Sequence, residues 1–225
     1  NTPSSMGHKH CDIGLLHLSS VMDFKIVLSN MTQSKRRTLM IQGELFEKNM
    51  PTGLTLSQLE SHLWAAANIL RGSPVDRTDW KSYILPLLFY KRICDVYDEE
   101  KAEMEKQFGV EFDEEQFAEE FQIRVPSNMH WDEIRKQSKN IGAALKSAMT
   151  QLESQNPEEL RGIFGDPAWE NKERFSDALI KDLIEHFSEL SLGNKTVRND
   201  IMGDAYEYLI KQFADSTNKK AGEFY

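Results

Sequence analysis

Residues 199–225 read N-D-I-M-G-D-A-Y-E-Y-L-I-K-Q-F-A-D-S-T-N-K-K-A-G-E-F-Y, and this stretch decides the fold class. Its apolar residues recur at steps of three and four, as the buried face of an α-helix does: Ile201, Ala205, Tyr206, Leu209, Ile210 and Phe213. After this face the chain becomes polar over residues 215–220 and then reaches Gly222 and two aromatic residues. We therefore expect a helix that is the last element of a helical body and is followed by a polar loop.

The segments upstream show the same helical periodicity. Ser57 and Glu60 have the spacing of a capping box, which predicts the start of a first helix. Its inward face is predicted to be Leu59, Leu63, Ala66, Ala67 and Leu70, with Gly72 as the stop signal.

The second predicted helix begins after Thr78 or Asp79, either of which can cap it. Pro86 lacks a backbone donor and is expected to kink or loosen this helix locally. Few charges occur before Lys91, so the segment is predicted to lie at the centre of the core. Its inward residues are Trp80, Tyr83, Ile84, Leu87, Leu88, Ile93 and Tyr97.

Shorter helices are predicted over residues 132–139 and 140–154. Asn156 and Pro157 form the usual pair at a helix start and predict one further turn, and Ser176 predicts a helix ending near Gly193. No run alternates as strands do, so the fold class is all-α, a helical bundle. The expected division is an N-terminal extension over 1–53, a helical bundle domain over 54–215, and a linker with the first residues of a following domain over 216–225.

The net charge of −9 is concentrated in one segment. Residues 98–120 contain eleven acids and two lysines, so the remaining chain is balanced. This acidic ridge, as we call residues 98–120, repels phosphate and should face away from nucleic acid; the simpler interpretation is a solvated face. No apolar run is long enough for a membrane helix. The two cysteines, Cys11 and Cys94, and the absence of a signal-peptide pattern favour a cytoplasmic location.

Few side-chain patterns indicate chemistry. The segment His8-Lys9-His10-Cys11 lacks a second ligand pair at finger-like spacing, so we interpret it as a polar terminus rather than a metal site. His62, His130 and His186 fall on separate helical segments and are interpreted as packed or surface residues. The four tryptophans are interpreted as core. Several scattered basic residues are candidates for phosphate contacts, most of them more simply solvated: Arg71, Arg77, Lys81, Lys91, Arg92, Lys136, Lys139, Lys195, Arg198, Lys219 and Lys220.

Several segments in one order resemble the methylation subunit of type I restriction–modification systems. They are L-W-A-A-A at 63–67, D-W-K-S-Y-I-L-P-L-L-F-Y-K-R at 79–92, the tracts around 156–164 and 186–188, D-A-Y-E-Y-L-I at 204–210, and K-K-A-G-E-F-Y at 219–225. The resemblance covers about residues 54–225. It implies the N-terminal helical domain of such a subunit, running into the start of its adenine-specific DNA methyltransferase domain.

The resemblance implies a cofactor, S-adenosylmethionine, and candidate cofactor contacts at Glu223, Phe224 and Tyr225. Lys219 and Lys220, beside them, are candidate DNA-binding residues. The implied partners are the specificity and restriction subunits, a second copy of the methylation subunit and double-stranded DNA. The Gly-rich loop and the Asn-Pro-Pro-aromatic motif of adenine methyltransferases do not occur in these 225 residues, so no catalytic residue is assigned. The alternative is a non-catalytic helical protein-interaction module.

Overall fold

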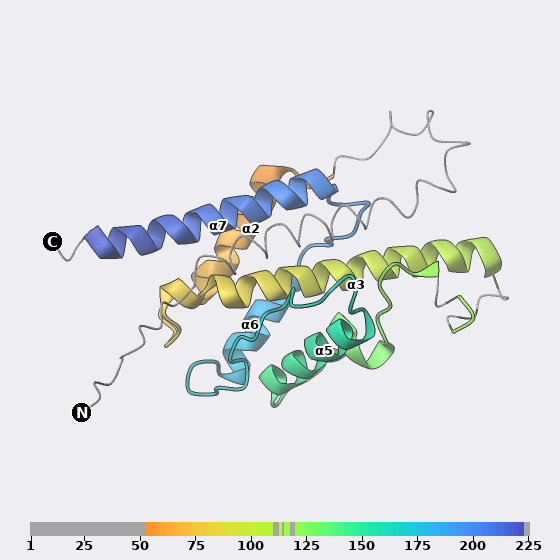
Figure 1. Cartoon of the computed structure of the whole chain (residues 1–225), viewed down its shortest axis with the longest axis horizontal. Coiled ribbons are helices and arrows are strands. Elements are labelled where there is room, and N and C mark those ends of the chain that lie inside the picture. The colour runs from red at the N-terminus through yellow and green to blue at the C-terminus, as the bar shows by residue number, and fades with distance from the viewer. Residues whose placement is uncertain (1–52, 110–112, 114, 118–119, 223–225) are drawn as a thin grey trace, which may run out of the picture.

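The computed structural model describes residues 53–109, 113, 115–117 and 120–222, with side chains as far as Phe213, and this part of the chain is helical with no strand (Figure 1). The expected all-α fold is confirmed. The α-helices are α2 (Leu56–Ile69), α3 (Lys81–Phe108), α4 (Trp131–Arg135), α5 (Ile141–Gln155), α6 (Asp177–Ser188) and α7 (Asn199–Gly222). Two short 3₁₀ turns, η3 (Arg77–Asp79) and η6 (Ser127–Met129), precede α3 and α4.

Helix α3 is the central element of the core. Every residue from 83 to 94 is buried, and all seven predicted inward residues are among the buried ones. The helix continues through Pro86 without a break (Figure 1). Pro86 lies in its second turn, so only one early hydrogen bond is lost there. Residues 83–94 have no solvent-exposed face, so other helices must pack around this part of α3.

The other helices supply that cover. Helices α2, α4, α6 and α7 all contact α3, and α5 packs on α6. In Figure 1, α7 runs back along α3 in the opposite direction, while α5 and α6 lie on the other side of α3. Tyr90 of α3 donates a hydrogen bond to the carbonyl of Met129 (2.5 Å), and Trp131 Nε1 donates to Ser188 Oγ (2.9 Å). These bonds tie the α4 region to α3 and α6.

The start of α2 differs from the prediction. Thr55, not Ser57, is the N-cap, and it forms a capping box with Gln58 in which the Gln58 amide donates to Thr55 Oγ1 (3.3 Å). Ahead of this cap, the Leu54 amide donates to the carbonyl of Thr196 (2.8 Å). This long-range bond fixes the extended approach of the chain, so the overlapping Ser57–Glu60 pattern falls inside the helix. The predicted inward face, Leu59 to Leu70, is confirmed.

Other boundaries also shift. Neither Thr78 nor Asp79 caps α3: its N-cap is Trp80, which makes no side-chain cap, and Asp76 caps the preceding turn η3. Helix α4 ends at Arg135 rather than 139, and Ser176 caps α6 as predicted, although α6 ends at Ser188 and not near Gly193.

Asn156 does not begin a helix. Its buried side chain accepts from the Arg124 amide (3.1 Å) and donates to the carbonyls of Arg124 (3.2 Å) and Leu152 (2.9 Å). A side chain used in this way cannot cap the turn that follows, so Asn156 instead ends α5 and holds the loop at Arg124. The turn itself is closed by the Leu160 amide, which donates to the Asn156 carbonyl (2.9 Å).

Helix α7 is longer than predicted. The polar residues 215–220 belong to the helix, which runs to Gly222, and the expected loop there is wrong. The sequence analysis missed this part because residues 215–220 are polar and show no apolar periodicity. They include no proline, and no glycine lies between Gly203 and Gly222, so nothing in this stretch breaks a helix. Polar residues of this kind have enough helix propensity to continue a helix although their sequence shows no apolar stripe.

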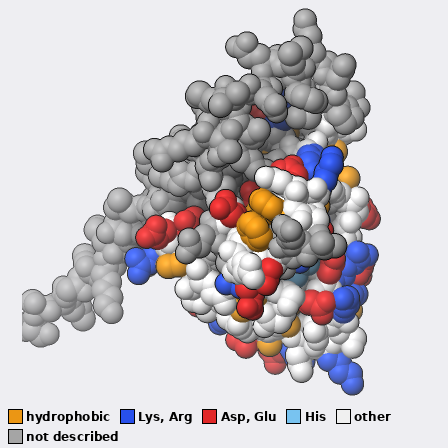
Figure 2. Space-filling model, turned by 90° about the vertical axis from the view of Figure 1, so that its right-hand side faces the viewer, with side chains coloured by type: hydrophobic (Ala, Val, Ile, Leu, Met, Phe, Trp, Pro, Cys, Tyr) orange, Lys and Arg blue, Asp and Glu red, His pale blue; other side chains and the backbone are white. Residues whose placement is uncertain are grey.

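The acidic ridge is only partly a solvated face. Glu100 is buried, and Asp98, Glu99 and Glu103 contact other segments of the protein. Figure 2 faces the end of the molecule reached by the C-terminal half of α3, and shows acidic and basic side chains interspersed on its described surface. Residues 110–112, 114 and 118–119 of the ridge lie outside the described residues. No helix in the described part is long and apolar enough to span a membrane.

Candidate functional site

Buried Arg92 of α3 holds the connector, residues 189–198, that joins α6 to α7. Its side chain is 2% exposed, and it donates to the carbonyls of Leu192 and Val197. It also donates to the side-chain oxygens of Asn194 and Asn199, the latter at 2.7 Å. The planar guanidinium reaches all four acceptors because its donors diverge in a fixed fork. One side chain therefore sets the path of the chain into α7.

Acidic residues of α3 continue this attachment. Asp95 accepts from the Leu192 amide (2.7 Å) and pairs with Lys91 (2.5 Å). One and two turns further on, Glu99 accepts from the Lys195 amide (3.2 Å) and Glu103 pairs with Lys195 Nζ (3.3 Å). A Cβ at Gly193 would overlap the Glu99 carboxylate, so a larger residue there would displace this side chain from the Lys195 amide.

The electrostatics of the connector suit a fixed structural role. Burial lowers the pKa of Arg92 to about 10, while Glu99 and Asp95 oppose the shift, so the guanidinium stays charged at neutral pH. Burial raises the pKa of Asp95, and Lys91 opposes this. Arg92 and Lys91 were among the candidates for phosphate contacts. Both are buried and bonded inside the protein, so that interpretation is wrong for them.

Other basic candidates have partners on the surface. Lys195 pairs with Glu103, Arg198 with Asp200 (2.7 Å) and Lys136 with Glu133 (2.6 Å). Such exposed pairs contribute little stability and can exchange a carboxylate for a phosphate. These residues therefore stay available for contacts with an anionic partner.

Two of the five predicted site residues lie within the described part of the chain. Lys219 and Lys220 are within the last turns of α7. Glu223, Phe224 and Tyr225 lie outside the described residues, as does the segment His8 to Cys11.

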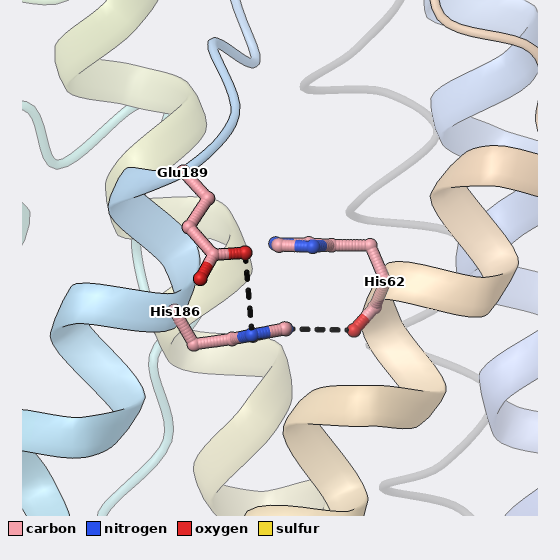
Figure 3. A group of neighbouring side chains, drawn as sticks. All are labelled: His62, His186 and Glu189. Atoms are coloured by element: carbon pink, nitrogen blue, oxygen red, sulfur yellow. Dashed lines mark hydrogen bonds and ion pairs between the residues drawn. The ribbon is translucent and has the colours of Figure 1, made fainter.

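The structure brings together two histidines that the sequence analysis kept apart. His62 of α2 and His186 of α6 stack with ring centroids 3.9 Å apart and planes 12° apart (Figure 3). Glu189, at the C-cap of α6, lies beside them, with an oxygen 3.8 Å from His186 Nδ1. His130 is elsewhere, where Nε2 pairs with Asp98 (3.1 Å). Only the spacing of His186 and Glu189, three apart on one helix face, was visible in the sequence.

Neither of two hollows on the described surface fits the nucleoside part of the implied cofactor. A cavity of about 30 Å³ beside Trp169 and Lys146 has room for about one water molecule. A hollow of about 470 Å³ is open and lined only by charged residues: Asp132, Arg135, Lys136, Lys181 and Glu185. A cofactor pocket needs apolar or aromatic walls, which this hollow lacks. We therefore assign no cofactor contact within the described residues.

Comparison with known families decides where this helical body belongs. The family described as HsdM N-terminal domain matches residues 59–187, from the inward face of α2 to the end of α6. The chain belongs to this family. The HsdM N-terminal domain thus contains the α2–α6 part of the bundle, including α3 with Arg92. Directly after it, residues 197–225 match a second family, N-6 DNA Methylase. The second match starts in the connector and includes all of α7.

The chain is also similar to two type I restriction enzyme methylase subunits. The chain is 25% identical over 186 residues to the type I restriction enzyme MjaIX methylase subunit of Methanocaldococcus jannaschii, covering 75% of this chain and 33% of that protein. It is 22% identical over 200 residues to the type I restriction enzyme MpnII methylase subunit of Mycoplasma pneumoniae, covering 74% of this chain and 37% of that protein. The chain thus spans about a third of the length of these relatives.

Proposed function

We propose that this chain is the N-terminal helical domain of the DNA methylation subunit of a type I restriction–modification system. The complete subunit would transfer a methyl group from S-adenosylmethionine to adenine in DNA. The helical domain would serve assembly with the other subunits and closure around the duplex. S-adenosylmethionine, when bound, supplies the methyl group, and Glu223, Phe224 and Tyr225 stay the proposed contacts to it.

One observation carries this proposal: the two families match in succession and meet at the connector that Arg92 holds. Helix α7 belongs to the methylase match, yet it packs on α2 and α3 of the HsdM body. Because α7 packs rigidly on the HsdM body and is also part of the methylase match, it would fix the orientation of the methylase domain relative to the HsdM body. This favours a positioning role for the helical body over a free-standing adaptor module.

The proposed partners are one specificity subunit, a second methylation subunit, a restriction subunit and double-stranded DNA. The specificity subunit would read the target sequence. Contacts from this domain would then be directed at phosphates and be independent of sequence. Lys219 and Lys220, near the end of α7, are the proposed DNA-contacting residues.

The chemistry is tested with the complete methylation subunit and its specificity subunit on unmethylated duplex DNA. After incubation with S-adenosylmethionine, the DNA is digested and its nucleosides are separated. The proposal expects N6-methyladenine. Methylcytosine, or no modified base in a complex that assembles and binds DNA, contradicts it and leaves the adaptor alternative.

The clamping role is tested by a salt series of DNA affinity in the same complex. Lys219→Glu with Lys220→Glu should weaken binding to all sequences alike and reduce its salt dependence, because fewer counterions are released. The matched variant is Glu105→Lys with Glu115→Lys, at two exposed acids of the acidic ridge. It should leave binding unchanged or tighten it. Loss of affinity in the acid variant alone would reverse the proposed orientation on DNA.

A further inference from the structure

The cluster of His62, His186 and Glu189 joins two helices that are far apart in the sequence. One potential ligand atom from each residue lies within 4.8 Å of the other two. Figure 3 shows the two rings one above the other, with the Glu189 carboxylate at their open edge. The histidines are partly buried, whereas the Glu189 side chain is 67% exposed, so the cluster is accessible from solvent.

The hydrogen bond of His186 fixes which of its nitrogens is free. Nε2 lies 2.9 Å from the backbone carbonyl oxygen of His62, and a carbonyl can only accept, so Nε2 carries the proton. In the neutral ring, Nδ1 then has a lone pair, and it faces a Glu189 oxygen at 3.8 Å. That separation is too long for a hydrogen bond. A lone pair opposite a carboxylate favours a cation between them.

This arrangement of His186 is also the one that metal-binding histidines use. Such a histidine typically donates its second ring N–H to a backbone carbonyl or carboxylate, which fixes the tautomer and the ring orientation. Here the carbonyl is that of His62, so the second candidate ligand residue orients the first.

His62 is prepared for a ligand as well. Its Nε2 is buried and has no hydrogen-bond partner among the described residues. A buried polar atom without a partner calls for an explanation, and an absent ligand supplies one.

We propose that His62, His186 and Glu189 form a binding site for a divalent first-row metal ion of the Zn²⁺ class. Two imidazoles and one carboxylate suit such ions, and three protein ligands leave one tetrahedral position for water. The bound ion connects the second turn of α2 to the end of α6. The ion would add a cross-link between these two helices beyond their side-chain packing.

Binding requires a local side-chain movement. The lone pairs of stacked rings lie in parallel planes and do not converge, so one ring must turn about χ2 to face the ion. The exposed Glu189 carboxylate is free to follow. His186 is restrained by its bond to the His62 carbonyl, so the His62 ring is the one that turns.

The test is a Zn²⁺ titration of the 225-residue chain by calorimetry. The N-terminal segment could bind metal too, so all variants also carry His8→Ala, His10→Ala and Cys11→Ala. The proposal expects one Zn²⁺ per chain in this background. Glu189→Gln and His186→Gln should each weaken the affinity about tenfold or more, since even substitutions around a ligand cost 10–100-fold.

Two matched controls should keep the affinity. Glu185→Gln removes a carboxylate one turn earlier on α6, and His130→Gln removes a histidine outside the cluster. Co²⁺ in place of Zn²⁺ should give the visible absorption of a four-coordinate site, lost in Glu189→Gln. No binding in this background, or binding that the Glu189 and His186 variants leave unchanged, overturns the proposal. Circular dichroism of each variant checks that it is folded, and the exposed position of Glu189 makes Glu189→Gln the safest variant.

Discussion

At the scale of single residues, buried Arg92 fixes the connector between α6 and α7 through four hydrogen bonds. Its four acceptors all belong to residues 192–199, about a hundred positions along the chain. The sequence shows only a Lys-Arg pair after an apolar run, which resembles a helix reaching the surface. The buried role of Arg92 depends on the path of the connector, residues 189–198. Local periodicity in the sequence does not encode that path.

Replacement of Arg92 should therefore destabilise the protein strongly. Arg92→Met keeps the aliphatic stem and leaves the Leu192 and Val197 carbonyls without this donor, at about 1–3 kcal/mol for each buried acceptor. Arg92→Lys should recover only part of the loss, because a single ammonium cannot span the four acceptors. Urea unfolding measures the free energies, with exposed Arg124→Met as the control. An unfolding midpoint equal to that of the control would refute the role of Arg92.

His130 gives the stability a predictable pH dependence. The neighbouring Asp98 carboxylate raises the pKa of half-buried His130 above 6.5, against the opposing effect of burial. A raised folded-state pKa stabilises the protein fully below 6.5, and the stabilisation is lost as pH rises through the folded value. The free-energy difference between the wild type and Asp98→Asn should therefore shrink as pH rises between about 5 and 8. A difference that grows over this range would contradict the assignment.

At the scale of elements, the periodic faces were predictable and the boundaries were not. The inward residues of α2 and α3 follow from spacing alone, because amphipathic helices must bury one stripe. Caps depend on the approach of the chain, as the bond from Leu54 to Thr196 shows. The C-terminal half of α7 was missed because its polar sequence has no apolar stripe to detect. The pairing of His62 with His186 was missed because it depends on how α2 packs against α6.

The two overlapping capping patterns can be separated by mutation. Thr55→Ala removes the cap that α2 uses and should cost about 0.5–2 kcal/mol. Ser57→Ala changes an exposed residue inside the helix and should cost almost nothing. Thermal melts of both variants give the comparison. A larger loss for Ser57→Ala would restore the pattern predicted from the sequence.

The packing of α3 sets a second expectation at this scale. Leu88 is completely buried among α3 neighbours, so Leu88→Ala should cost about 2–5 kcal/mol through lost contacts and the cavity left behind. Met104 lies on the same helix but is only partly buried, and Met104→Ala should cost less. Chemical denaturation of the two variants tests this ranking. Equal losses would mean that the centre of the core lies elsewhere.

At the scale of the whole molecule, the helical body and the methylase segment are joined by one helix. Helix α7 is packed on the HsdM body and leads to the residues proposed to meet the cofactor. The family, the all-α fold and the core of this arrangement were predictable from motif order and periodicity. The connector that sets the direction of α7 was not, since its partners come from α3.

We propose that this chain positions the methylase domain and does not by itself transfer a methyl group to adenine. The most direct measurement is transfer of radiolabelled methyl groups from S-adenosylmethionine to unmethylated duplex DNA. The purified 225-residue chain should transfer none, whereas the complete methylation subunit with its specificity subunit should label the DNA. Label transferred by the 225-residue chain, or none transferred by the assembled complex, would contradict the account.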